Sequence, residues 1–196
     1  PGQMFLVKKP VNSVADIAGM EICSGGGISE ASAKALGASP LVKPAPESYE
    51  ILASGVADGT FFPSESIKSF NLDKVVKHAT IFPGGFYSSA FGFFMNEEKW
   101  NKLPKQDQDA IMSVSGEALA RLAGKAWDAA DKGGMDALKA AGVNIQQASP
   151  AFISEVRART EPLANNWIQA ANAKGLDGAK VLAEFREELK RVAEGK

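Results

Sequence analysis

The sequence predicts an α/β protein in which short strands alternate with helices. Between residues 20 and 62, apolar runs and helix-forming stretches follow one another in the order strand, helix, strand, helix, strand. Gly37 and Gly55 follow the two helical stretches, where a helix end favours a residue in the left-handed conformation. This order predicts βαβ units and a parallel sheet. Such sheets bind ligands outside the carboxyl ends of their strands, which here places Phe61 and Phe62 near a ligand.

The elements of the first half follow from apolar runs and from the residues that interrupt them. Strands are expected at residues 5–7, 20–23, 41–42, 56–62, 75–82 and 86–95. Helices are expected at residues 15–17, 28–36, 46–52 and 63–70, where proline starts two of them and glycine ends three. The turn Pro83-Gly84-Gly85 separates the last two strands.

The second half is predominantly helical. After a short helix that Asn96 caps, apolar residues at spacings of three and four predict one helix from Lys105 to about Ala140. Unbroken, it would span roughly 40–50 Å, enough to bridge two lobes. Gly133 and Gly134 are expected to kink it. A strand at 143–147, a helix at 150–173 and a last helix at 179–192 with one apolar face complete the chain.

Composition excludes several classes of function. The net charge of −1 over 196 residues argues against nucleic-acid binding, which needs a basic excess. The sequence contains no apolar run of about 18 residues, so the chain is not expected to be embedded in a membrane. The start Pro1 shows no signal-peptide pattern and is not expected to begin a complete translation product. A single cysteine and a single histidine predict no disulfide, no metal site and no cofactor.

Four blocks of sequence carry a resemblance to a known family. They read DIAGMEI at 16–22, LGASP at 36–40, ESY followed by Leu52 and GVADG at 47–59, and MNEEKWNKLP at 95–104 followed by Gln108 and Ile111. In this order and spacing they resemble the solute-binding proteins of TRAP transporters, the DctP-type periplasmic binding proteins, from about Ser13 to the end. The resemblance implies a periplasmic-binding-protein-like fold of two α/β lobes, a ligand cleft between them and a long helix crossing both. It also implies a periplasmic location and delivery of a small organic solute to membrane permease subunits that use an ion gradient.

The resemblance covers only part of such a protein. Mature members are about half as long again, so it implies the C-terminal two thirds, without the N-terminal part of one lobe. Residues 13–82 and 141–196 would form mostly the C-terminal lobe, and residues 83–140 would be shared with the other lobe. A truncated lobe exposes apolar surface, so a homodimer through it is one expectation.

Two positions depart from the family pattern. The carboxylate-clamping arginine that follows the Gly-Met-Glu-Ile strand is here Cys23, and the asparagine that often assists it is Phe62. Neither replacement reproduces the bidentate geometry with which arginine holds a carboxylate. We therefore expect an aromatic or otherwise apolar solute instead of a plain C4-dicarboxylate.

The candidate ligand-binding residues are Cys23, Ser24, Gly25, Gly26, Gly27, Phe61, Phe62, Glu65, Phe86 and Tyr87. The glycines precede a helix, so their N–H groups could receive an anion in place of the lost arginine, and the alternative is a flexible connection. Phe62 would form an aromatic wall, although adjacent phenylalanines in a strand more often pack on its two sides, one inward and one outward.

Each remaining candidate also has a simpler interpretation. Cys23 suits a small buried side chain at a strand end. Tyr87 either offers its hydroxyl to a ligand or lies on a strand surface. Glu65 is either a solvated helix residue or a partner for a ligand hydroxyl or amine. The tryptophans at 100, 127 and 167 lie in helical patterns and are interpreted as packing residues.

Two other functions compete with transport. A sensor or scaffold protein of the same fold would present a bound ligand to a partner protein. An enzyme would use Cys23 or Glu65 as its reactive group. The sequence contains no recognisable set of nucleophile, base and orienting group, and His78 is its single histidine, so we expect no catalysis.

Overall fold

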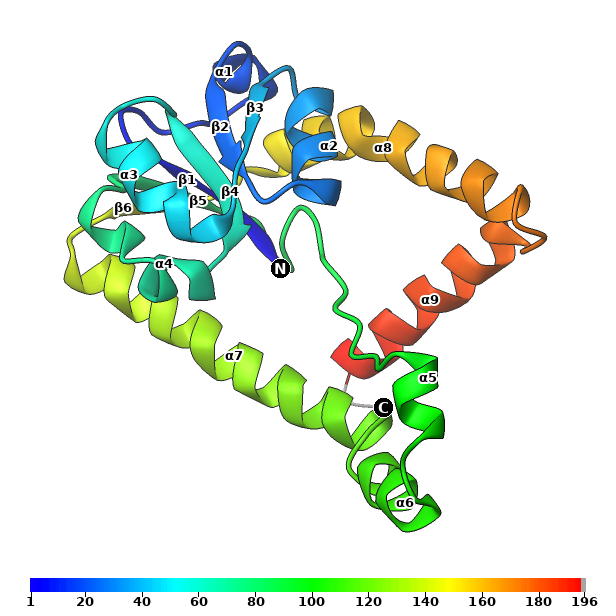
Figure 1. The fold of residues 1–196 in the computed structure, drawn as a ribbon. Coiled ribbons are helices and arrows are strands. Elements are labelled where there is room, and N and C mark those ends of the chain that lie inside the picture. The colour runs from blue at the N-terminus through cyan, green and yellow to red at the C-terminus, as the bar shows by residue number, and fades with distance from the viewer. Residues whose placement is uncertain (195–196) are drawn as a thin grey trace.

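A mixed six-stranded sheet forms the centre of the fold (Figure 1). The computed structural model describes residues 1–194. The strands lie side by side in the order β3 (Ser39–Val42), β2 (Glu21–Ser24), β4 (Gly59–Pro63), β1 (Gly2–Leu6), β5 (His78–Ile81) and β6 (Asn144–Gln147). β2 is parallel to β3 and β4, which confirms the parallel pairing predicted for residues 20–62. β5 is also parallel to β6. β1 is antiparallel to both of its neighbours, so the sheet as a whole is mixed.

Helices cover both faces of this sheet. On one face lie α1 (Val14–Ile17), α2 (Gly27–Ala35) and the start of α8 (Pro150–Asn172), and on the other lie α3 (Ser48–Ala53), α4 (Glu65–Ser69) and the end of α7 (Glu117–Ala140). Short 3₁₀ turns at Ala45–Glu47 and Leu72–Lys74 precede α3 and follow α4. Successive residues of β1 point to opposite faces: Met4 and Leu6 join the first core and Phe5 joins the second, all fully buried. Alternate residues of β1 therefore contribute to two hydrophobic cores, one on each face of the sheet.

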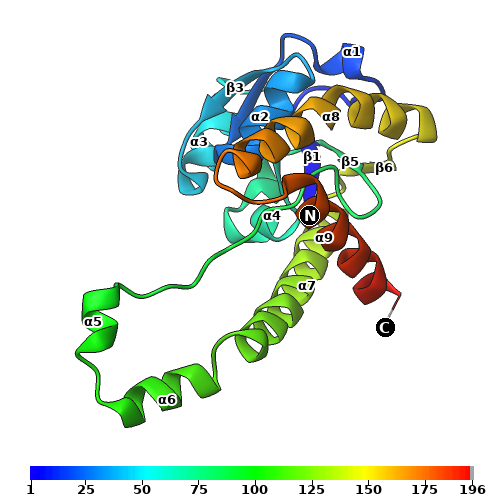
Figure 2. The same cartoon turned by 90° about the vertical axis from the view of Figure 1, so that its right-hand side faces the viewer.

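Helical segments project from the sheet in two directions (Figures 1 and 2). α7 leads away from α4 towards α5 (Glu97–Asn101) and α6 (Lys105–Ser113), and α8 leads in another direction to α9 (Gly178–Ala193). α9 carries the expected apolar stripe, but Phe185, Leu189 and Val192 on it are more than half exposed. Among the described residues, no helix combines the length and apolarity needed to cross a bilayer.

The predicted strand at 86–95 is wrong. Residues 88–95 form no regular element, and Phe93 is 93% exposed. Only the start of this segment pairs with the sheet, through the backbone hydrogen bonds Gly2 N–H to Tyr87 O and Phe86 N–H to Gly2 O. An apolar run becomes a strand only beside another strand, and the described part of the chain places none next to residues 88–95.

The predicted long helix is two helices. α6 ends at Ser113 and α7 begins at Glu117, with Gly116 between them at φ 59°, outside helical geometry. The 24 residues of α7 extend about 36 Å. Gly133 and Gly134 do not interrupt it, contrary to the expected kink. Gly134 instead allows close packing, because a Cβ there would overlap the carbonyl oxygen of Ser64.

Candidate functional site

The predicted site residues surround the carboxyl edge of the sheet. β2 ends at Ser24 and the parallel β4 ends at Pro63. Because β1 runs the other way, its first residue, Gly2, lies opposite Pro63 at the same edge. The backbone of Phe86 and Tyr87 is hydrogen-bonded to Gly2, so this segment also passes the edge. The topology thus gathers segments that are far apart in the sequence.

Phe61 and Phe62 point to opposite faces of β4, as alternation predicts. Phe61 belongs to the core beneath α2 and α8, and Phe62 belongs to the core beneath α3, α4 and α7. One of the two rings was expected to point outward from the sheet, but helices cover both faces, so both rings are buried: Phe61 is fully buried and Phe62 is 6% exposed. A Cβ at Gly25 would lie 3.8 Å from the Phe62 ring, which places the glycine loop beside it.

An aromatic cluster forms around Phe86. Its ring centroid lies 5.0 Å from those of Phe61 and Tyr87, both edge to face, and 5.3 Å from that of Phe82. The Tyr87 hydroxyl donates to the Phe61 carbonyl oxygen at 2.8 Å, and Ser29 Oγ donates to the same oxygen at 2.9 Å. Burial raises the pKa of Tyr87. The tyrosine proton is therefore used within the chain, and a ligand role for Tyr87 stays a prediction.

Cys23 is buried at the end of β2. Its Sγ lies 3.5 Å from Ser48 Oγ, and burial raises the pKa of the thiol. His78 is on β5, where its ring contacts the Asn144 amide, so cysteine and histidine have separate partners. This burial agrees with the simpler interpretation of Cys23. A ligand role for Cys23 stays a prediction.

The glycine loop starts α2 as expected. Gly26 and Gly27 have φ angles of 90° and 61°, values that residues other than glycine rarely adopt. The Gly26 N–H donates to Ser24 Oγ at 3.0 Å, so one of the loop's donors is already used. Glu65 begins α4, and its carboxylate accepts hydrogen bonds from Ser66 and Ser69 of its own helix, at 2.7 and 2.9 Å.

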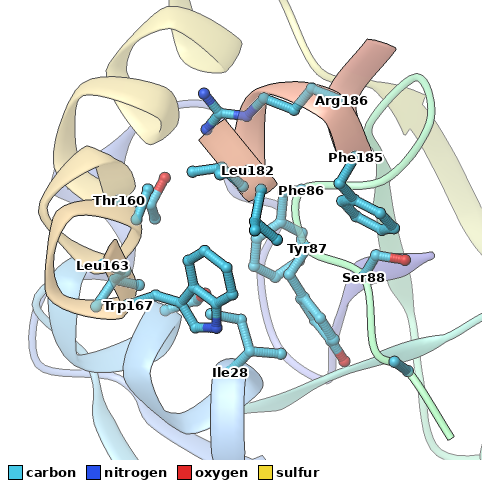
Figure 3. A pocket seen from close by; sticks show the side chains of 14 residues that line it. Ile28, Phe86, Tyr87, Ser88, Thr160, Leu163, Trp167, Leu182, Phe185 and Arg186 are labelled. Carbon is cyan, nitrogen blue, oxygen red and sulfur yellow. The ribbon is translucent and has the colours of Figure 1, made fainter. Parts of the chain in front are cut away.

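Two hollows flank Tyr87 and Ser88, which line both. The smaller, about 330 Å³, lies at the sheet edge, where Gly2 and Pro63 meet Trp127 and Asp131 of α7. The larger, about 640 Å³, lies between α2, α8 and α9. Figure 3 shows Ile28, Leu163, Trp167, Phe86, Tyr87 and Phe185 around it, with the Arg186 guanidinium at one end. Of the predicted ligand-binding residues, only Phe86 and Tyr87 line either hollow. The others line neither: Cys23, Ser24, Gly25, Gly26, Gly27, Phe61, Phe62 and Glu65.

Several lining residues were not predicted. Trp167 and Trp127 were interpreted as packing residues, and Arg186 and Asp131 were not considered. The apolar stripe of the last helix could have indicated a facing wall, since Leu182 and Phe185 belong to it. Nothing in the sequence indicates which element α9 faces.

The comparisons with known proteins agree with this architecture. Residues 2–170 match the model of the DctP family, described as bacterial extracellular solute-binding protein, family 7. The chain belongs to the DctP family. The predicted resemblance is thereby confirmed, and the family is one of solute-binding proteins, not of enzymes.

Solved structures confirm the fold. A TRAP periplasmic solute-binding protein from Bordetella bronchiseptica, with bound (R)- and (S)-mandelate, is 46% identical with a TM-score of 0.90, over 98% of this chain and 61% of that one. A marine-metagenome TRAP protein specific for aromatic acid ligands, in complex with 3-hydroxybenzoate, is 31% identical with a TM-score of 0.79, over 93% of this chain and 58% of that one.

Curated relatives are more distant. The protein named outer membrane transporter protein TsaT, from Comamonas testosteroni, is 27% identical over 95% of this chain and 55% of its own length. The C4-dicarboxylate-binding periplasmic protein DctP of Rhodobacter capsulatus is 31% identical over 58% of this chain and 33% of its own length. The chain thus spans about half or less of these two relatives.

Proposed function

We propose that the protein is the extracytoplasmic solute-binding subunit of a TRAP-type transporter and that it captures an aromatic acid. The observation that carries this is the cluster of Phe61, Phe86 and Tyr87 at the carboxyl edge of the sheet, beside two hollows with aromatic linings. Aromatic walls with a few polar groups suit a ring-bearing solute. The mandelate and 3-hydroxybenzoate bound by two relatives support the same class.

Capture would occur by closure of two lobes over the solute. This chain spans 61% of the Bordetella protein, so the second wall of the cleft is proposed to include residues outside it. Residues 13–82 and 141–196 are proposed as mostly one lobe, and 83–140 as shared. The loaded protein would then deliver its solute, in the periplasm, to the membrane permease.

The acid group of the solute needs a partner, because Cys23 and Phe62 provide none. The N–H groups of the glycine loop that Ser24 leaves free are the proposed donors, since they lie beside Phe62 at the start of α2. A homodimer through the truncated lobe is a further partner proposal, which light scattering on this 196-residue chain would test.

A thermal-shift screen on the full-length protein tests the solute class. Mandelate, benzoate and 3-hydroxybenzoate are compared with succinate and malate, because a ligand that binds only the folded state raises the unfolding midpoint. We expect shifts with the aromatic acids, and Trp127→Ala, which removes an exposed ring from the lining of the smaller hollow, is expected to reduce them. Shifts with the dicarboxylates alone would refute the proposed class.

A further inference from the structure

The turn that follows β4 is held by a helix distant in sequence. The first N–H groups of a helix lack partners within it, and the Ser64 side chain does not cap α4. The backbone N–H of Glu65 instead donates to Asp131 Oδ1 of α7 at 2.8 Å. A carboxylate that accepts from a helix N-terminus is also favoured by the helix dipole. Asp131 therefore caps α4 from outside.

A second contact joins α7 to the same turn. Gly134 is buried, and a Cβ there would overlap the Ser64 carbonyl oxygen and lie 3.2 Å from the Glu65 nitrogen. At Gly133 the nearest such neighbour is Lys68 Cδ at 3.9 Å, an ordinary van der Waals distance. The backbone of α7 thus rests directly on the peptide between Ser64 and Glu65.

This turn borders the hollow at the sheet edge. Pro63 precedes it, and both Pro63 and Asp131 line the hollow of about 330 Å³. A second lining segment also contacts α7, because the rings of Phe91 and Trp127, which both line the hollow, stack at 4.8 Å with 25° between their planes. Two segments that line the hollow thus both contact α7.

We propose that Asp131 and Gly134 are positioning residues of the solute site, which hold the Pro63–Glu65 turn against α7. The proposal rests on the proposed function. When the turn is held in one place, the whole population is competent to bind. When it is released, the apparent affinity falls by the fraction of molecules in which the turn has moved.

The test compares three variants of the full-length protein. Asp131→Ala removes the acceptor, and Asp131→Asn retains an oxygen in the same place. Asp136→Ala is the matched control: it is on the same helix, its side chain is 52% exposed, and within the described residues it pairs with Lys132 and Lys139 of its own helix. Amide hydrogen exchange of residues 64–67 without solute and calorimetric titration with (R)-mandelate are the two measurements.

The expected results separate positioning from general stability. Asp131→Ala should speed exchange at residues 64–67 about fivefold, the typical factor for loss of a helix cap. It should also weaken mandelate binding, by at most the same factor of about five, because the affinity falls only by the fraction of molecules in which the turn has moved. The unfolding midpoint should fall by no more than roughly 2–4 °C. Asp131→Asn should restore most of both properties, and Asp136→Ala should leave both unchanged.

Contrary results have distinct meanings. Unchanged exchange in Asp131→Ala would overturn the cap itself, and faster exchange with unchanged mandelate affinity would overturn the positioning role. A wild-type protein that binds no aromatic acid would refute the proposed function. The exchange comparison of the alanine, asparagine and control variants would then still decide whether Asp131 caps α4 and holds the turn.

Discussion

Replacing Gly134 by alanine is expected to destabilise the protein, whereas the same change at its neighbour Gly133 is expected to stabilise it. Alanine in a helix interior is favoured over glycine by about 0.5–1 kcal/mol. At position 133 the new methyl group meets only the flexible Lys68 chain at 3.9 Å, so this gain is retained. At position 134 it overlaps backbone atoms of Ser64, which cannot rotate away. Inserting a methyl group into such a packed contact costs roughly 1–3 kcal/mol.

The pair of variants isolates the helix crossing. Both carry the same gain in helix propensity, so the difference between their free energies of unfolding measures the overlap, roughly 1–3 kcal/mol. Chemical denaturation followed by circular dichroism measures both values. For a chain of this size about 1 kcal/mol corresponds to roughly 2–4 °C in the unfolding midpoint. Equal stability of the two variants, or a more stable Gly134→Ala, would refute the close packing of α7 on the turn.

Two further predictions concern hydrogen bonds away from this crossing. The Asp16 carboxylate accepts a hydrogen bond from the N–H of Asn12 at 2.9 Å, and this bond lowers the pKa of Asp16 from 3.8. The ionised carboxylate therefore stabilises the folded state above pH 3.8, and this contribution is lost as the pH falls through the lowered pKa. Denaturation should show that Asp16→Asn has a smaller free energy of unfolding than wild type at pH 7 and that this difference shrinks below pH 3.8. A deficit that stays constant with pH would contradict this assignment. Tyr87→Phe removes the hydroxyl that donates to the Phe61 carbonyl oxygen, but that oxygen still accepts the hydrogen bond from Ser29. Urea denaturation should therefore show a free energy of unfolding lower by about 1 kcal/mol or less. A decrease above about 3 kcal/mol would show that Tyr87 contributes more than this single hydrogen bond.

The local pattern of the chain was sufficient for most elements. Apolar runs bounded by glycine and proline located the strands, and spacings of three and four located α8 and α9. The alternation of Phe61 and Phe62 was predicted because neighbouring strand residues always point to opposite faces. The ordered sequence blocks were sufficient for the family, which the match over residues 2–170 confirms.

Only the tertiary structure decided which residues meet. Phe61 contacts Phe86 and Tyr87 because the antiparallel β1 brings Gly2, and with it the following segment, to the end of β4. Gly134 was expected to kink a helix, yet it permits close packing of α7 on the turn before α4. Residues 88–95 have strand-like composition but no neighbouring strand in the described chain. The reason is common to all three: hydrophobic periodicity depends on residues three or four positions apart, whereas strand order and helix crossings depend on contacts between residues tens of positions apart.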